Sequence, residues 1–327
     1  MSFGGEGYAA STGGYHLLND LWKFDIGTGD WIWINGDSTV DNTAVYGIQG
    51  IAASANKPSA RSASISWVES DGNLCLFGGF GYAASSGRGY LNDLWKYDPL
   101  TNKWMWVKGD SIINPISVYG TQGISSATNK PSGRDYCYKW KDNLGNFWLY
   151  GGYGHSYSTC CFGGLSDLWR YKPSTNEWTW MKGDTLLDGQ VNYGIVGVPD
   201  VNNRPGSRDG GVSWTDNSGN FWLFGGTSTD FNDNAADQDY FNDLWKLGTI
   251  TCGNGFTWIG VTDTNWTVGS NWCCDAVPGI NDDVIIPSGT PYNAIVPNGV
   301  TVSCRSLTIQ TGAIVNVGFS AHIKVTH

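Results

Sequence analysis

The stretch Asn92-Asp93-Leu94-Trp95 decides the fold of this chain, because close copies of it return about every 74 residues. An aromatic-Gly-Gly triplet precedes each copy, and a Trp-x-Trp pair follows three of them. One supersecondary unit is therefore built in series, and the core forms where neighbouring units pack. The other copies are Asn19-Asp20-Leu21-Trp22, Ser166-Asp167-Leu168-Trp169 and Asn242-Asp243-Leu244-Trp245.

Each unit divides into four strand-like segments. In the second unit, an alternating run at 63–67 leads through a turn containing Asp and Gly to a short apolar run at 74–77. A third strand over 93–97 and a fourth over 103–107 follow, joined by a turn at 98–102. No segment has helical periodicity over a useful length. Four antiparallel strands per unit without a helix are typical of a β-propeller blade.

The residues of this unit resemble the kelch repeat. The matching features are Gly78-Gly79 after the second strand, Asn92 to Asp98 in the third, the turn from Pro99 to Asn102 and the later Trp104. The resemblance covers roughly residues 1–250 and implies an all-β fold with about four kelch-like propeller blades. Kelch blades usually span ~50 residues. Here the excess lies between the fourth strand of one blade and the first strand of the next.

The long segment between blades is itself repeated, over 36–61, 109–134 and 183–208, with a Tyr-Gly pair inside each copy. A loop without a structural role would not keep register, so we expect an ordered lobe packed against its neighbours. In a four-stranded antiparallel blade, the 2–3 and 4–1 connections lie on one face, which these long segments build up. Loops on a rigid scaffold carry binding residues, so we expect function on this built-up face.

The first blade is incomplete in the sequence, because Met1-Ser2 is followed at once by Phe3-Gly4-Gly5, the end of a second strand. We therefore expect a fragment of a longer polypeptide. The third strand of this blade, around 20–24, should offer an unpaired edge, and exposed edges template pairing with other chains. Either upstream residues complete this blade, or the chain self-associates there.

From about Cys252 the character of the sequence changes. The stretch Asn281-Asp282-Asp283-Val284-Ile285-Ile286-Pro287 follows a Trp-rich opening and precedes short alternating strands. This part resembles a recurrent module of large secreted bacterial proteins and implies β-helix-like strands. The predicted domains are therefore residues 1–251 and 252–327. Phe256-Thr257-Trp258-Ile259 fits equally the fourth strand of the last blade and the start of this module.

The composition limits the class of partner. The net charge is −10, and Lys and Arg are scattered without a basic stripe, which argues against nucleic-acid binding. No apolar run approaches the ~20 residues needed to cross a bilayer, and no signal peptide is visible. Few charged residues, at 15%, together with many Ser, Thr, Asn and Gly are typical of a secreted or cell-surface protein. We therefore expect an extracellular location.

The eight cysteines match no zinc-binding pattern. We interpret Cys75 and Cys137, which lie within strand patterns, as buried thiols. In an oxidising compartment, disulfides are expected in the tail, among Cys252, Cys273, Cys274 and Cys304.

An Asp recurs in all four units and an Arg in three of them. Because a catalytic group is needed once and a structural group in every blade, we interpret both as structural. The Asp side chains are expected to accept local backbone hydrogen bonds where the third strand begins, and the Arg side chains to pair with carboxylates or carbonyls. These residues are Asp20, Asp93, Asp167, Asp243, Arg61, Arg134 and Arg208.

Residues that do not repeat are better candidates for a site. The 2–3 loop of the last blade is unusually acidic and rich in oxygen donors, of which calcium takes six to eight. It does not match an EF-hand, since Ala235 stands where the turn Gly would be and Phe241 where the bidentate Glu would be. The alternatives are a calcium site and a solvated polar loop, formed by Asp230, Asn232, Asn234, Asp237 and Asp239.

The corresponding loop of the third blade holds Cys160-Cys161 beside Tyr and His side chains suited to ligand binding. A copper or zinc site competes there with a disulfide or a packed loop. Some kelch-type propellers are copper radical oxidases, but their set of two His, a Tyr and a Cys-crosslinked Tyr does not converge here, where His16 and His155 are the only propeller histidines. The ligand-binding candidates are Tyr82, Tyr153, His155 and Tyr157.

No nucleophile elbow, phosphate-binding loop, His-Glu-x-x-His or paired-carboxylate motif occurs, so the motifs give catalysis no support. We predict a non-enzymatic extracellular or cell-surface binding protein, acting in adhesion, recognition or extracellular assembly. A protein or a glycan would bind on the built-up face. The alternative is a secreted carbohydrate-active or lectin-like propeller whose Tyr and Trp side chains stack on sugars.

Overall fold

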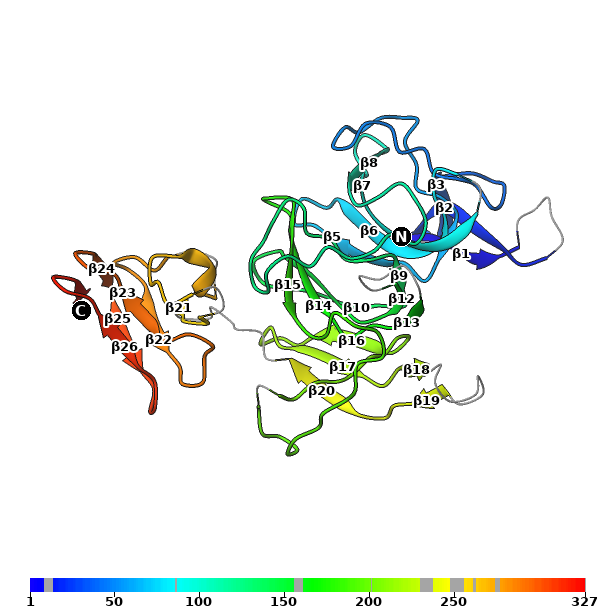
Figure 1. Cartoon of the computed structure of the whole chain (residues 1–327). Coiled ribbons are helices and arrows are strands. Elements are labelled where there is room, and N and C mark those ends of the chain that lie inside the picture. Colours follow the sequence, from blue (N-terminus) through cyan, green and yellow to red (C-terminus); the bar gives the residue numbers. More distant parts are fainter. Residues whose placement is uncertain are drawn as a thin grey trace. The chain divides into compact units, whose positions relative to one another are not determined.

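The computed structural model describes most of the chain. The described residues are 1–8, 14–85, 87–155, 161–200, 202–229, 238–247, 256–260, 263–273 and 277–326. They form an all-β structure in two compact units, and within the first unit a series of small antiparallel sheets follows the chain from blue to yellow (Figure 1). The second unit comprises chiefly residues 246–327.

Two blades have the four-stranded antiparallel sheet that the sequence predicts. Blade 2 pairs β5 (Ile65–Val68), β6 (Leu74–Tyr82), β7 (Arg88–Asp98) and β8 (Lys103–Lys108) in that order. Blade 3 repeats the order with β10 (Tyr138–Lys141), β11 (Phe147–Tyr150), β14 (Leu168–Lys172) and β15 (Glu177–Lys182). The kelch-like fold predicted from the repeats is thereby confirmed.

The two flanking blades have three strands each in the described part of the chain. Blade 1 has the order β1 (Ser2–Gly7), β2 (His16–Asp25) and β3 (Asp30–Asn35). Blade 4 has the order β16 (Val212–Thr215), β17 (Phe221–Phe224) and β20 (Leu244–Leu247).

The unpaired edge expected on the third strand of blade 1 is only partly present. Ser2 and Phe3 pair with Trp22 and Leu21, so β1 covers that part of the strand. The prediction of a free edge is therefore wrong at these two positions. The few residues before Gly4 are already extended and suffice to form a strand pair.

Each blade bends at its Gly-Gly pair. The ladder between β6 and β7 shifts register between Phe77 and Gly79. Gly79 has φ +97°, and a Cβ there would lie 2.5 Å from the carbonyl oxygen of Ser62. Only glycine allows both this φ and this close approach.

Short strands lie beyond the bend, at the end of each blade that carries the 2–3 and 4–1 connections. They are β4 (Arg61–Ser62), which pairs with β6, β9 (Arg134–Asp135), which pairs with β12 (Tyr153–His155), β13 (Phe162–Gly164), which also pairs with β12, and the pair of β18 (Thr227–Thr229) with β19 (Gln238–Tyr240).

Large aromatic rings form the core between blades. Trp67 of blade 2 stacks on Phe147 of blade 3 with a centroid distance of 4.9 Å, and Phe77 meets Trp178 at 5.3 Å. All four side chains are buried. The core thus lies where successive blades pack, which is the arrangement that serial repetition predicts.

The second unit consists of short parallel strand pairs, which confirms the β-helix-like strands. β21 (Phe256–Thr257), β22 (Asp283–Ile286) and β25 (Ser306–Ile309) pair in that order. β23 (Ala294–Val296) pairs with β26 (Val315–Val317), and β24 (Thr301–Cys304) with β27 (His322–Val325). Phe256-Thr257 thus belongs to this module, and does not form the fourth strand of the last blade.

Most of the described cysteines are free thiols. Cys75 lies in β6 and is buried as expected, whereas Cys137 lies between β9 and β10 and is only half-buried. Cys304 is a buried free thiol, so it takes no part in the disulfides expected in the tail.

Candidate functional site

A buried ion pair repeats in successive blades and forms a structural frame. Both Nη atoms of Arg61 donate to the carboxylate of Asp93, at 2.6 and 2.7 Å, and both side chains are fully buried. The Trp95 indole donates to the same carboxylate at 2.7 Å. Burial disfavours the charged guanidinium, but the Asp93 carboxylate overrides this and raises the pKa of Arg61. The corresponding pairs are Arg134–Asp167 and Arg208–Asp243.

The partners of Asp93 are thus side chains, whereas local backbone amides were expected. A bidentate guanidinium and an indole hold the carboxylate in one orientation. The same contacts recur at Asp167 and Asp243, so they cannot distinguish one blade from another.

The lobes between blades are ordered and extend this frame. The Tyr46 hydroxyl of the first lobe (36–60) donates to Asp93 at 2.8 Å, and its ring lies 5.1 Å from Trp95 and 5.0 Å from Trp106. Tyr119 of the second lobe (109–133) makes the same contacts with Asp167, Trp169 and Trp180. Each lobe therefore fastens one blade to the next.

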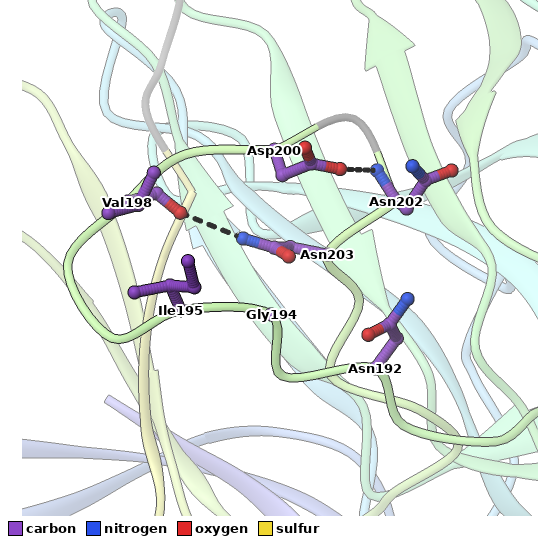
Figure 2. A pocket seen from close by; sticks show the side chains of 7 residues that line it. All are labelled: Asn192, Gly194, Ile195, Val198, Asp200, Asn202 and Asn203. Atoms are coloured by element: carbon purple, nitrogen blue, oxygen red, sulfur yellow. Dashed lines mark hydrogen bonds between the residues drawn. The ribbon is translucent and has the colours of Figure 1, made fainter.

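The third lobe (183–207) contains a pocket at the place where the first lobe is hydrogen-bonded to the neighbouring strand β8. In the first lobe, the Asn56 amide donates to the carbonyl oxygens of both Ile51 and Trp104. The corresponding Asn203 donates to Val198 within its own lobe, beside the open space that Figure 2 shows. Blade 4 has no fourth strand among the described residues, so this pocket reflects a missing neighbour in the repeat.

A second set of positions lies just beyond the frame, and the residues at these positions differ from blade to blade. We call it the variable layer: the residue after the frame Arg, the residue after Gly-Gly, and the residue three before the frame Asp. The pairing of strands places the three positions of each blade side by side. They are Ser62, Phe80 and Tyr90 in blade 2, Asp135, Tyr153 and Gly164 in blade 3, and Asp209, Thr227 and Tyr240 in blade 4. We add Phe162 to this layer, because its ring contacts that of Tyr90.

Aromatic rings of the variable layer contact one another across blades. Tyr90 of blade 2 lies 5.2 Å from Phe80, 5.7 Å from Tyr153 and 5.3 Å from Phe162. Phe162, at the start of β13, is 41% exposed, and the other three rings are half-buried. Half-buried rings in contact, tilted by 51° to 63° to the Tyr90 ring, offer an apolar surface that is already ordered before a ligand arrives.

Two carboxylates lie beside these rings. Asp135 is only 7% exposed, and its Oδ1 atom has no hydrogen-bond partner among the described residues. Asp209 accepts a hydrogen bond from the Thr227 hydroxyl at 3.1 Å. Burial, and next the charge of Asp209, raise the pKa of Asp135 to about 7. Burial also raises the pKa of Asp209. The backbones that follow the two aspartates are joined, since the Gly210 amide donates to the Tyr136 carbonyl at 3.0 Å, so Asp135 and Asp209 lie on adjacent segments of neighbouring blades.

The backbone next to Asp135 is strained. Tyr136 has φ +50° and is 55% exposed. The corresponding residues are Ala63, with φ +52°, and Gly210, with φ +67°. The Tyr136 amide donates to the Ala63 carbonyl, and the Gly210 amide to the Tyr136 carbonyl, so the left-handed position links the strands of neighbouring blades. A bulky residue with positive φ costs about 1–3 kcal/mol, and because the left-handed position recurs in three blades, it is part of the repeated framework.

The structure brings some of the predicted ligand-binding residues to this layer. Tyr153 pairs directly with Asp135, and burial raises its pKa to about 12. His155 is buried, with its ring 4.1 Å from Phe162. Tyr82 lies at the end of β6, where burial and the nearby Asp41 raise its pKa. Tyr157 lies outside the described residues.

The proposed calcium loop is mostly outside the described part of the chain. This holds for Asp230, Asn232, Asn234 and Asp237, and Asp239 is described only as part of the β19 backbone. Calcium binding by this loop stays a prediction. Among the residues that are described, no three His, Cys, Asp or Glu side chains gather in a way that could hold a metal ion.

Most members of the variable layer were not predicted from the sequence. Asp135, Asp209, Tyr90 and Phe162 were not candidates, because each stands beside a repeated motif and belongs to none. The aligned repeats show only that these positions vary, and not that they form one site. Aligned on the frame Arg and Asp, these are positions at which neighbouring blades differ.

Comparisons with known proteins support the fold. The Kelch motif family matches residues 58–111, and a domain of unknown function, DUF8693, matches residues 257–327. No curated protein matches the chain. The solved structure "Structure of YjhT" is similar at 16% identity, over 70% of this chain and 75% of that chain, with a TM-score of 0.37. Likeness at this level carries no conclusion about function. No helix in the described residues is long and apolar enough to span a membrane.

Proposed function

We propose that this chain is a non-enzymatic binding protein of the extracellular space or cell surface, which holds a protein partner at the variable layer. Kelch repeats generally mediate protein–protein binding, and this supports the class of partner. The extracellular location rests on the composition and on the resemblance of the C-terminal module to secreted proteins.

The observation that carries the proposal is the contrast between the frame and the variable layer. The frame repeats and is buried, as a structural element must be. The layer differs from blade to blade, and it presents contacting Tyr and Phe rings that solvent reaches. Aromatic residues are enriched in the energetically important centres of protein interfaces.

The test is to pan a random peptide library and a glycan array against the intact protein and two variants. Tyr153→Ala combined with Phe162→Ala removes rings from the layer. Trp31→Ala is the matched control, because Trp31 is 58% exposed and lies in β3, outside the layer. We expect peptide binding that the double variant loses and the control keeps. Equal binding by all three proteins would refute the proposal.

A second candidate function is a carbohydrate-active enzyme, and one observation favours it. Asp135 and Asp209 lie on hydrogen-bonded segments of neighbouring blades, and Asp135 pairs with the aromatic Tyr153; many glycosidases act through two carboxylates. Hydrolase and oxidase assays on every glycan of the array separate the two functions. Turnover of a sugar that Asp135→Asn abolishes would establish the second candidate in place of the first, whereas sugar binding without turnover would indicate a lectin-like protein.

A further inference from the structure

The variable layer contains a buried carboxylate without a counter-charge among the described residues. Asp135 is next in sequence to Arg134, but both Nη atoms of that guanidinium donate to Asp167. Asp209 follows Arg208, which is likewise committed to Asp243. Both arginine side chains are fully buried, so neither can turn toward the layer without breaking the frame.

The surroundings of Asp135 would suit a positive charge. Its neighbour across the strand pair is Tyr153, and the Tyr153 and Tyr90 rings lie 5.7 Å apart. Faces of aromatic rings attract cations, most strongly where water is excluded. The second carboxylate, Asp209, is held close by the hydrogen bond from the Gly210 amide to the Tyr136 carbonyl, 3.0 Å long. The buried Oδ1 atom of Asp135 is an acceptor for which the described residues provide no donor.

We propose that the variable layer binds a cationic side chain, the ammonium of lysine or the guanidinium of arginine on a partner polypeptide, between Asp135 and Asp209 and against the rings of Tyr90 and Tyr153. This inference rests on the proposed function and adds the chemistry by which the partner is recognised. An ion pair with an arriving cation supplies the counter-charge that the described residues do not give Asp135.

A metal ion fits this place less well. Calcium takes six to eight oxygen ligands, and the layer provides two carboxylates without a third His, Cys, Asp or Glu in the described part of the chain. A lysine or arginine side chain needs fewer acceptors and gains from the rings. The net charge of −10 also favours the approach of a cationic partner.

The experiment uses three amino-acid derivatives as probes: Nα-acetyl-lysine methylamide, Nα-acetyl-arginine methylamide and Nα-acetyl-norleucine methylamide. The last has an uncharged chain of nearly the length of lysine. Binding to the full chain is followed by NMR at millimolar probe concentrations. We expect the lysine or arginine probe to shift the Tyr90 and Tyr153 signals, and the norleucine probe to leave them unchanged. Comparing the first two tells which cation the site prefers.

Matched variants locate the effect. Asp135→Asn and Asp209→Asn should each weaken binding of the cationic probe at least tenfold, to be verified on protein that keeps its thermal transition. Asp30→Asn removes the same charge from an exposed position in blade 1 and should leave binding unchanged. The inference is overturned if norleucine binds as well as lysine, if no probe shifts the signals, or if folded Asp135→Asn binds like the wild type. It is also overturned if binding needs added calcium.

Failure of this inference can be told from failure of the proposed function. If library peptides bind the wild type and Asp135→Asn equally but are lost in the Tyr153→Ala, Phe162→Ala protein, the layer binds a partner without a cation. If the ring variants also leave peptide binding unchanged, the layer is not the binding site at all.

Discussion

Two buried carboxylates of blade 3 show how strongly the environment of a residue decides its role. Asp167 receives both Nη atoms of Arg134, the Tyr119 hydroxyl and the Trp169 indole. Asp135 is the residue next to that arginine, and one of its oxygens receives no donor from the described residues. The first carboxylate stabilises the fold as an anion, while the second is easier to bury with a proton.

The stability of the protein should reveal the proton on Asp135. Its pKa is raised to about 7 from an ordinary 3.8, so between these pH values the folded protein keeps a proton that the unfolded chain has lost. The stabilisation that this group contributes to the folded state is fully present below its ordinary pKa and is lost as the pH rises through about 7. Asp135→Asn should therefore become more stable than the wild type by up to about 4 kcal/mol as pH rises across this window. Chemical denaturation at several pH values measures this difference, and a difference that is independent of pH would contradict it.

The Arg134–Asp167 pair, unlike Asp135 in its present state, should stabilise the folded protein. Arg134→Met leaves a buried carboxylate without its counter-charge and should cost about 3–5 kcal/mol of stability. Arg204→Met is the matched control, because its pair with Asp184 is 3.2 Å long and both side chains are more than a third exposed. It should cost at most about 1 kcal/mol. Equal losses in the two variants, measured by urea denaturation, would argue against the structural role of the buried pair.

At the scale of elements, the lobes act as covers for the fourth strands. The Gly50 amide donates to the Trp106 carbonyl at 2.8 Å, and the Ala53 amide to the Trp104 carbonyl at 3.3 Å, along the outer edge of β8. In the second lobe, the Ser126 amide donates to the Trp178 carbonyl in the same way. An uncovered outer strand would present free amides and carbonyls to other chains. The repeated register of the lobes in the sequence thus has a structural cause.

Hydrogen exchange should distinguish the first lobe from the third. Gly197 and Asp200 correspond to Gly50 and Ala53, but their amides have no acceptor among the described residues. We expect the amides of Gly50 and Ala53 to exchange slowly and those of Gly197 and Asp200 to exchange quickly, because an amide without a hydrogen bond needs no opening event. Slow exchange at Gly197 and Asp200 would show that another segment occupies the pocket in Figure 2.

The Gly-Gly bend can be tested with two glycines of blade 2. Gly72 and Gly79 both have positive φ, but a Cβ at Gly72 has no atom within 4 Å, whereas a Cβ at Gly79 meets the Ser62 carbonyl oxygen at 2.5 Å. Gly72→Ala should cost about 1–2 kcal/mol of backbone strain. Gly79→Ala should add about 1–3 kcal/mol of steric strain to this. Thermal unfolding compares them, and equal costs would show that the inner strand tolerates a methyl group.

At the scale of the whole molecule, the chain joins two β units that differ in strand direction. The blades pair strands in antiparallel fashion through short turns, whereas the C-terminal module pairs strands in parallel fashion. Each unit has its own buried aromatic core, with Trp178 in the first and Trp272 in the second. The proposed binding site belongs entirely to the first unit.

Separate cores should give separate unfolding transitions. Trp178→Ala and Trp272→Ala each remove a fully buried indole and should cost about 3–5 kcal/mol in the unit that contains it. Calorimetry should show that each variant lowers the midpoint of a different transition. A single transition that both variants shift equally would mean that the two units unfold cooperatively.

The repeats in the sequence are sufficient to determine the architecture. The four strands of blades 2 and 3, the turns between them and the need for glycine at the Gly-Gly pair follow from local patterns that reappear in register. Such features depend on residues close in sequence, or on the same contact made again in each blade, so one chain contains several copies of the same signal.

The variable layer was decided by the tertiary structure alone. Asp135, Asp209, Tyr90 and Phe162 come from three blades, and nothing in their local sequence marks them as neighbours. Strand pairing and blade packing bring the rings within 6 Å of one another and bury Asp135 where no described residue donates to its Oδ1 atom. Burial and the proximity of charges are properties of the folded chain. For this reason the sequence could predict the scaffold and the face on which binding was expected, but not the residues that form the site.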